Sequence, residues 1–178
     1  MDIVITNCIK MLKARKYINI EHHNGDDTDE SNTITANDSS GKNVMVIILD
    51  EDRLNISSVK ECISTFAEND INIGILLYSG DPTSSAKKTL ANLEGSGRIR
   101  ISIFPISNFR FCLTDHKLVF PHHRVKKDVA QQLKKKYGAD KLPVILSSDP
   151  VAKYYNFRSG EVISITRRDN TISYRIVR

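Results

Sequence analysis

Three neighbouring residues have side chains suited to metal-dependent hydrolysis: Asp115, His116 and Lys117. A carboxylate followed two positions later by a lysine forms half of a nuclease signature. In that signature the carboxylate binds Mg²⁺ and the lysine steadies the attacking water. Such a site needs a second carboxylate upstream, which Asp50 or Asp81 could supply. Because the tripeptide is short, a surface turn is the ordinary interpretation, and a Mg²⁺-dependent nuclease using Asp115 and Lys117 is the rival one.

The other residues capable of chemistry do not form a recognisable site. The histidines His116, His122 and His123 lack a second ligand cluster at zinc-like spacing. The three cysteines are scattered without a CxxC pair, which favours a reducing intracellular setting. The sequence has no glycine-rich phosphate loop and no GxSxG nucleophile motif. We therefore expect no catalytic residue, no metal and no cofactor.

Charge is distributed unevenly along the chain of 178 residues. Residues 1–108 carry 11 Lys and Arg against 15 Asp and Glu, a net −4, whereas residues 109–178 carry 15 against 6, a net +9. A strongly basic half suggests a polyanionic partner or an acidic protein surface, and a free-standing nucleic-acid-binding module is one hypothesis for it. A solvated lysine-rich face is the ordinary alternative. We expect neither a signal peptide nor a membrane span, because the longest apolar run, residues 44–49, is short.

Residues 1–113 have the alternating pattern of an α/β domain. Helices are predicted over residues 3–16, from 57 or 58 to 69, and from 84 or 85 onward, and strands over 44–49, 71–78 and 98–104. The alternation of apolar and polar residues in the last strand continues at Phe109, Phe111 and Leu113. Residues 21–43 are polar and nearly free of large apolar groups, which predicts a flexible loop. The order of elements implies one α/β layer.

Residues 114–178 predict a small α+β module with an antiparallel hairpin. Val125, Val129, Leu133 and Tyr137 recur at every fourth position, which predicts a helix that ends at Gly138. Ser148 or Asp149 can cap a second, short helix with Pro150 in its first turn. Two strands then flank a two-residue loop, Asp169-Asn170, with four isoleucines expected in the core: Ile163, Ile165, Ile172 and Ile176.

The stretch LPVILSSDPVAKYYNFRSGEVISITRRDNTISYRIV, residues 142–177, resembles the C-terminal module of the fifth-largest common subunit of eukaryotic RNA polymerases I, II and III. In archaeal RNA polymerase the same module forms a whole small subunit. Residues 114–122 resemble the family's THHELVPxH segment, and residues 66–88 resemble part of its N-terminal domain. The Asp115-His116-Lys117 tripeptide falls where the family has H-H-E, which weakens the nuclease interpretation. The chain is shorter than typical eukaryotic members, as expected of a divergent or viral lineage.

The resemblance implies functional residues of two kinds. The partner-binding residues would dock the module on the largest polymerase subunit: His122, Pro143, Asp149, Pro150, Tyr154, Gly160, Arg167, Tyr174 and Arg175. The DNA-proximal residues would lie near downstream duplex DNA: Pro82, Thr83, Ser84, Ser85, Lys87 and Lys88. The N-terminal domain would have a nuclease-like α/β fold without a catalytic site and would form part of the polymerase jaw.

The function expected from this resemblance is that of a non-catalytic subunit of a multisubunit DNA-dependent RNA polymerase. Catalysis would belong to the large subunits, and this chain would contact them and, weakly, downstream DNA. No membrane and no small-molecule substrate is expected. The location would be the nucleus for a cellular polymerase, and the virion or host cytoplasm for a viral one.

Overall fold

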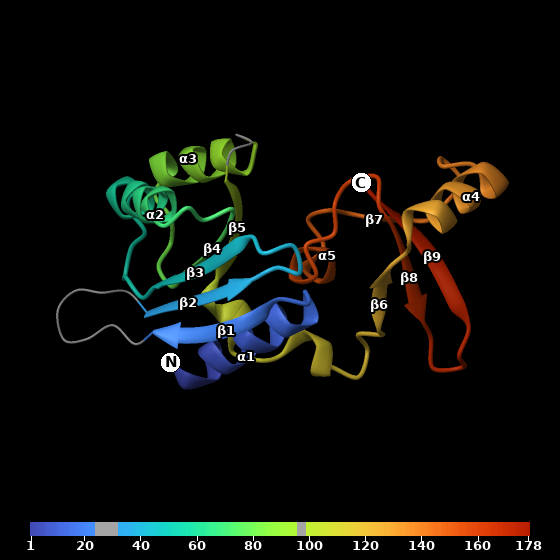
Figure 1. Cartoon of the computed structure of the whole chain (residues 1–178), viewed down its shortest axis with the longest axis horizontal. Helices are drawn as coiled ribbons and strands as arrows, with labels where there is room; N and C mark the ends of the chain where they lie inside the picture. Colours follow the sequence, from blue (N-terminus) through green and yellow to red (C-terminus); the bar gives the residue numbers. More distant parts are fainter. Residues whose placement is uncertain (24–31, 96–98) are drawn as a thin grey trace. The chain divides into compact units, whose positions relative to one another are not determined.

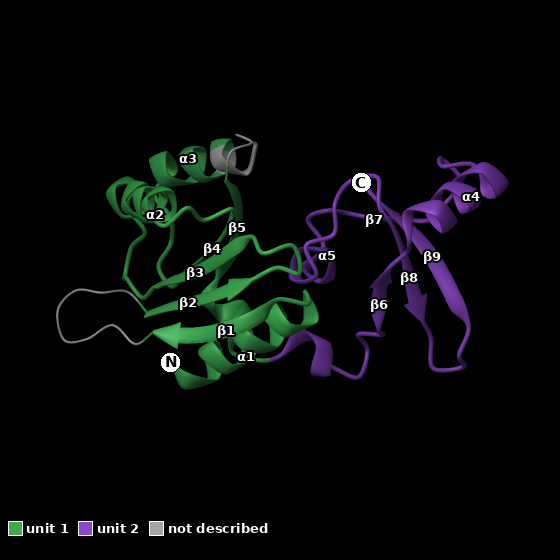
Figure 2. Ribbon diagram, in the orientation of Figure 1, with its two compact units in different colours: residues 1–111 green, residues 112–178 purple. Residues whose placement is uncertain are grey.

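The chain folds into two compact units, Met1–Phe111 and Cys112–Arg178 (Figure 2). The structure is a computed structural model, and it describes residues 1–23, 32–95 and 99–178. The division falls two residues before the predicted boundary between residues 113 and 114. Each unit has its own sheet and its own core, and each is described separately below.

Unit 1 is built on a five-stranded sheet with the order β1-β2-β3-β4-β5 (Figure 1). Strands β3, β4 and β5 are parallel, whereas β1, β2 and β3 form an antiparallel meander. The elements are α1 (Asp2–Ala14), β1 (Ile18–His23), β2 (Asn32–Asn37), β3 (Asn43–Leu49), α2 (Ile56–Glu68), β4 (Ile73–Tyr78), α3 (Ser84–Gly95), β5 (Arg100–Pro105) and the 3-10 turn η1 (Ile106–Phe109). The predicted α/β layer is therefore present, with two extra strands.

The predicted flexible loop over residues 21–43 is wrong for residues 21–23 and 32–37, which form strands. Strands β1 and β2 pair antiparallel within it, and β2 also pairs with β3; residues 24–31 lie outside the described residues. Ile34 and Ala36 of β2 are buried, while Thr33 and Thr35 between them are half-buried. Two apolar side chains on alternate positions are enough here because the neighbouring strand β3 supplies most of the buried surface.

Helices cover both faces of this sheet, with α1 on the side opposite to α2 and α3 (Figure 1). Met45, Ile47 and Leu49 of β3 pack with residues of α2 and α3, and the alternate residues of the strand point to the other face. Gly74 allows α2 to approach closely, since a Cβ atom there would lie 2.7 Å from the Phe66 ring. On the α1 side, Asn7 Nδ2 donates to the Phe109 carbonyl oxygen at 2.9 Å.

The segment after β5 does not continue as a strand, contrary to the prediction for Phe109, Phe111 and Leu113. It forms two 3-10 turns instead, η1 and, at the start of unit 2, η2 (Leu113–Asp115). Phe109 is buried and meets the Phe104 ring edge-on at 5.6 Å between centroids. Phe111, by contrast, is 61% exposed. The apolar alternation in the sequence therefore does not correspond to one strand with a buried face.

Unit 2 is a four-stranded sheet with the order β6-β8-β9-β7. Strand β8 pairs antiparallel with β6 and β9, and β7 pairs parallel with β9. After η2, its elements are β6 (His122–Arg124), α4 (Lys127–Tyr137), β7 (Val144–Ile145), α5 (Pro150–Tyr154), β8 (Val162–Thr166) and β9 (Ile172–Val177). The predicted α+β module with an antiparallel hairpin is therefore present.

Helices α4 and α5 pack on opposite faces of the unit 2 sheet. Val162 of β8 belongs to a cluster with Ala130 and Leu133 of α4. Its neighbour Ile163 belongs to a second cluster with Ala152 of α5 and Phe157. Consecutive strand residues point to opposite faces, so the central strand is buried on both sides.

Three details of this unit differ from the predictions. The hairpin loop has three residues, Arg168 to Asn170, because the Arg167 amide donates to the Thr171 carbonyl and Asn170 takes a positive φ of 61°. Ile172, expected in the core, is 56% exposed. The predicted apolar stripe of α4 is only partly covered, with Val129 37% and Tyr137 49% exposed. The helix does end at Gly138, as predicted, with φ 84°.

Within the described residues, no helix is both long and apolar enough to cross a membrane.

We predict that Ile163→Ala costs about 2–5 kcal/mol of unfolding free energy, because its side chain is fully buried and leaves a cavity. Ile172→Ala is the matched control on the neighbouring strand. Its side chain is largely exposed, so the cost should stay within about 0.5 kcal/mol. Urea unfolding followed by circular dichroism measures both. Equal losses for the two variants would contradict the placement of β8 as the doubly buried strand.

Candidate protein-docking surface

The face of the unit 2 sheet that carries α5 brings together five of the predicted partner-binding residues: His122, Asp149, Pro150, Tyr154 and Arg175. We call it the α5 face and include in it Tyr155 and Phe157, which follow the helix. Pro143, Gly160, Arg167 and Tyr174, the other four predicted residues, lie elsewhere in unit 2 and are described below.

Helix α5 is short and depends on its first residues. The Asp149 side chain accepts a hydrogen bond from the Val151 amide at 2.8 Å, and Pro150 occupies the first helical position. The cap satisfies an amide that has no partner inside the helix, and proline has no amide to satisfy. The prediction of this cap is confirmed. Asp149 and Pro150 therefore position the helix; their side chains are not the chemically active part of the surface.

Aromatic rings line the α5 face in a continuous row. Tyr154 meets Tyr155 edge-on at 5.3 Å between centroids, and Tyr155 stacks on Phe157 at the same distance. The ring of His122, from strand β6, stacks on Tyr155 at 6.5 Å. Tyr154 is buried, and burial raises the pKa of its hydroxyl, so this group stays protonated near neutral pH. Rings fixed in this way make a rigid surface of mixed apolar and polar character.

His122 is held in one orientation at the edge of this row. Its Nδ1 lies 2.6 Å from the Phe120 carbonyl oxygen, and the side chain is half-buried. Burial lowers the pKa of the ring below its ordinary value. The Phe120 carbonyl and the Asp149 charge oppose this shift, and the charge of Arg175 adds to it. The ring is therefore neutral at neutral pH and offers a polar contact without a charge.

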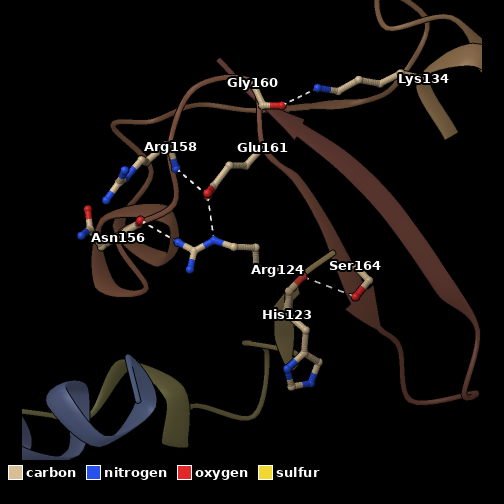
Figure 3. A network of polar contacts seen from close by, with 8 residues as sticks. All are labelled: His123, Arg124, Lys134, Asn156, Arg158, Gly160, Glu161 and Ser164. Carbon is tan, nitrogen blue, oxygen red and sulfur yellow. Dashed lines mark hydrogen bonds and ion pairs between the residues drawn. The ribbon is translucent and has the colours of Figure 1, made fainter. Parts of the chain in front are cut away.

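A polar network ties the ends of the unit 2 strands together next to the α5 face (Figure 3). Arg124 Nε pairs with Glu161 Oε2 at 2.9 Å, and Arg124 Nη2 donates to the Asn156 carbonyl at 3.0 Å. The same carboxylate oxygen of Glu161 accepts from the Arg158 amide at 2.9 Å. The Arg124 guanidinium also lies 5.5 Å from the centre of the Phe157 ring. One arginine thus links β6, the turn after α5 and the start of β8.

Sequence patterns gave no signal for this network, because Arg124 and Glu161 are 37 positions apart. Arg124 combines an ion pair, a hydrogen bond to a carbonyl and a contact with a ring. It therefore stabilises the fold more than an isolated surface ion pair would. It fixes the backbone that carries the aromatic row.

The remaining predicted partner residues have structural roles outside the α5 face. Gly160 takes a φ of 84° in the turn before β8, a conformation that favours glycine. The Pro143 carbonyl accepts from the Ile176 amide at 2.8 Å, and Tyr174 packs in the α4 cluster. The Arg167 guanidinium lies 5.6 Å from the centre of the Phe120 ring.

The residues considered for metal chemistry lie in turns. Asp115 ends η2, and His116 and Lys117 follow it with exposed side chains. His116 Nδ1 accepts a hydrogen bond from the Leu118 amide at 3.3 Å, which is a local turn contact. Over the described part of the chain, no group of three or more His, Cys, Asp or Glu side chains is placed to hold a metal ion.

The predicted DNA-proximal residues, Pro82 to Lys88, form the start of α3 in unit 1. The helix begins at Ser84, one of the two predicted starts, and the Thr83 Oγ1 just before it accepts from the Ala86 amide at 3.2 Å. The Thr83 amide in turn donates to the Leu54 carbonyl at 3.1 Å. Gly80 fixes the preceding turn, because a Cβ atom there would lie 2.3 Å from the Asp52 carbonyl oxygen.

Four side chains of this segment are exposed: Ser84, Ser85, Lys87 and Lys88. Ala86 between them is buried in the unit 1 core and holds the first turn of the helix in place.

Comparison with known families assigns unit 2 to a class of RNA polymerase subunit domains. Residues 111–177 match the family model described as RNA polymerase Rpb5, C-terminal domain, and this range is nearly that of unit 2. Residues 111–177 are therefore similar to the Rpb5 C-terminal domain family, and the resemblance read from the sequence is confirmed.

Several curated proteins are similar to the chain beyond this domain. The subunit rpabc1 of DNA-directed RNA polymerases I, II and III from Dictyostelium discoideum is 26% identical over 145 residues, 78% of this chain and 74% of the relative. The RPABC1 subunit of Caenorhabditis briggsae is 25% identical over 150 residues, 81% and 70% of the two chains. A putative DNA-directed RNA polymerase subunit of Invertebrate iridescent virus 6, 454R, is 28% identical over 127 residues, 65% and 67%. The similarity thus extends into unit 1.

We predict that His122 makes folding stability depend on pH. Its pKa is lowered in the folded chain, so the unfolded chain binds the proton more tightly. The stability contribution is complete above the ordinary value of 6.5 and is lost as pH falls through the lower folded pKa. The thermal midpoint should therefore fall less between about pH 7 and pH 5 in His122→Gln than in the unchanged protein.

His116→Gln is the control for this measurement, because His116 is an exposed histidine of the same unit and is not among the groups that act on His122. It should keep the pH profile of the unchanged protein. If the three proteins show parallel profiles by differential scanning calorimetry, the burial of His122 has no effect on its titration and the prediction is wrong.

Proposed function

We propose that the chain is a non-catalytic subunit of a multisubunit DNA-directed RNA polymerase, whose unit 2 docks on the largest subunit through the α5 face. The observation that carries this is the correspondence between the Rpb5 C-terminal domain match and one compact unit with its own core. A family domain that is also a separate unit is suited to serve as a docking module.

Physical features of the α5 face support a role in protein binding. Protein interfaces are enriched in aromatic residues and arginine and depleted in lysine and glutamate. Tyr154 and Phe157 are buried beneath this face, and the half-buried Tyr155 and His122 and the exposed Arg124 give its accessible part this composition. The polar network of Arg124 and the cap of Asp149 fix these side chains before binding, which lowers the entropy lost on association.

Unit 1 is proposed to form part of the jaw around downstream DNA, as a nuclease-like α/β domain without a catalytic site. Its mixed sheet with helices on both faces supports this fold type, which the family resemblance implies. The DNA-proximal segment presents exposed Ser84, Lys87 and Lys88 at the start of α3. These groups favour phosphate oxygens without reading base sequence, and contact through them would be weak.

The setting proposed for the chain follows from its relatives. They include subunits of eukaryotic polymerases I, II and III and a putative polymerase subunit of an invertebrate iridescent virus. A divergent member of this family would work in the nucleus if cellular, and in the virion or host cytoplasm if viral.

We predict that the largest polymerase subunit contacts α5 and does not contact α4. A photo-crosslinking amino acid at Lys153, an exposed position of α5, should form an adduct with the largest subunit in polymerase purified through this chain. The same amino acid at Lys135, exposed on α4 on the other face of the sheet, is the control and should not. Mass spectrometry identifies the adducts. Failure of any large subunit to copurify would refute the proposed function itself.

A separate prediction concerns the DNA-proximal segment. A photo-crosslinker at Ser84, in polymerase assembled on a DNA template, should label DNA downstream of the active centre. The control is Lys60, an exposed position of α2, which should label protein or nothing. Labelled DNA is detected by a radioactive template strand. Labelling of protein alone from Ser84 would place this segment away from the duplex.

A further inference from the structure

Helix α4 carries a concentration of positive charge. Unit 2 has 14 Lys and Arg against 6 Asp and Glu, a net +8. Five of these lysines lie on α4 or at its N-cap: Lys126, Lys127, Lys134, Lys135 and Lys136. Four carboxylates of the unit accept hydrogen bonds away from this helix: Asp140, Asp149, Glu161 and Asp169. Asp128 is the acidic residue of α4 itself.

The lysines at the start of α4 are not explained by the stability of the helix. Cations stabilise a helix near its C-terminus, where Lys134 to Lys136 lie, and destabilise it near its N-terminus. Lys126 is the N-cap residue and makes no side-chain capping bond, and Lys127 is the first helical residue. Serine, threonine, asparagine or aspartate at the cap would make the helix more stable. The lysines at this end of the helix therefore need an explanation other than helix stability.

Helix α4 is packed in a fixed position against the sheet. Ala130 and Leu133 pack against Val162 and Ile176 of the sheet. Lys134 is turned toward the sheet and donates from Nζ to the Gly160 carbonyl at 2.6 Å (Figure 3). Helix α4 therefore cannot turn easily to hide its outer face, and the lysines of that face extend from a rigid support.

The outer face of α4 has the composition of a surface for nucleic acid more than of one for protein. Its exposed polar residues are Lys127, Asp128, Gln131, Gln132, Lys135 and Lys136. Val129 and Tyr137, which are 37% and 49% exposed, lie in one stripe with Leu133, and Leu133 packs toward the sheet. Protein interfaces need an apolar centre and are poor in lysine, whereas nucleic-acid interfaces are polar and strongly positive.

From this arrangement we infer that the outer face of α4 binds the phosphate backbone of duplex nucleic acid without reading its sequence. Lys127 and Lys135 are eight residues apart, about 12 Å along the helix at roughly 1.5 Å per residue. A B-DNA major groove is also about 12 Å wide, so lysines at the two ends of α4 reach phosphates on both sides of it. The glutamine amides between them can donate to further phosphate oxygens.

This surface is separate from the two parts of the proposed function. It lies on the face of the unit 2 sheet opposite the α5 face, so docking through α5 leaves it free. It is also distinct from the DNA-proximal segment, which belongs to unit 1. The inference therefore does not depend on the polymerase assignment, and the two can fail independently.

The test measures binding of the full chain to a fluorescent DNA duplex of about 20 bp and arbitrary sequence by anisotropy, from about 50 to 200 mM salt. The variant Lys127→Gln/Lys135→Gln removes two cations while keeping good helix formers. At about 0.9 per phosphate contact, the slope of log K against log salt should become shallower by about two, and affinity near 0.1 M salt should fall by about tenfold or more.

The matched control is Lys60→Gln/Arg158→Gln, which removes the same charge from exposed positions that do not belong to α4. It should keep the slope of the unchanged protein, and circular dichroism should show that both variants are folded. An equal change of slope in the two variants would mean that net charge alone binds the duplex, and this overturns the inference. So would an unchanged slope in the α4 variant.

A lysine surface could also bind an acidic protein. Polyglutamate of matched charge, added as a competitor, should displace the labelled duplex only at concentrations about tenfold higher than unlabelled duplex does. Displacement at equal concentrations of carboxylate and phosphate groups would assign α4 to an acidic protein segment and overturn the nucleic-acid inference.

Discussion

Unit 2 depends on the burial of β8 on both faces. Val162 and Ile163 are consecutive residues, and both are almost completely inaccessible. One anchors the cluster under α4 and the other the cluster under α5. A strand between two apolar layers has little freedom of register, because a shift by one residue would exchange the two sets of side chains. The neighbouring strands, the two helices and the surfaces they present are all positioned by this central strand.

This arrangement gives a small module, residues 112–178, two usable faces. On one side, α5 and the aromatic row form a rigid surface with few full charges. On the other, α4 carries a row of lysines. Because the sheet separates them, a partner of either kind can bind without competing for the same side chains. The polar network of Arg124 closes the end of the sheet beside the aromatic row.

Local signals in the sequence were sufficient for some elements and not for others. Asp149, Pro150 and Gly138 act within a few residues of themselves, so the cap of α5 and the end of α4 were predictable. The β1–β2 hairpin was missed because its strands have few apolar side chains, and β2 gains its stability from pairing with β3. The exposure of Ile172 depends on where the hairpin extends relative to α4, which alternation along the strand does not specify.

In the candidate site, too, some features had a signal in the sequence and others had none. Five of the motif residues of the resemblance lie on the α5 face, whereas others, such as Gly160 and Pro143, have backbone roles in turns and strand pairing, and their part in partner binding stays a prediction. A family motif reports every position that is restricted, whether by contact with a partner or by the backbone. The Arg124–Glu161 pair had no signal, because neither residue has a pattern that marks a partner 37 positions away.

The hydrogen bond between Asn7 and Phe109 restricts the order in which the chain can fold during its synthesis. Asn7 is buried, and the carbonyl that satisfies it belongs to a residue 102 positions later. At roughly 5–20 residues per second, the ribosome needs about 5–20 s to make that partner. Throughout this time part of the surface against which α1 packs is missing. The apolar side of the helix, with Cys8, Met11 and Leu12, stays accessible to chaperones. Unit 1 is thus completed from its last segment, although its first helix is synthesised at the start.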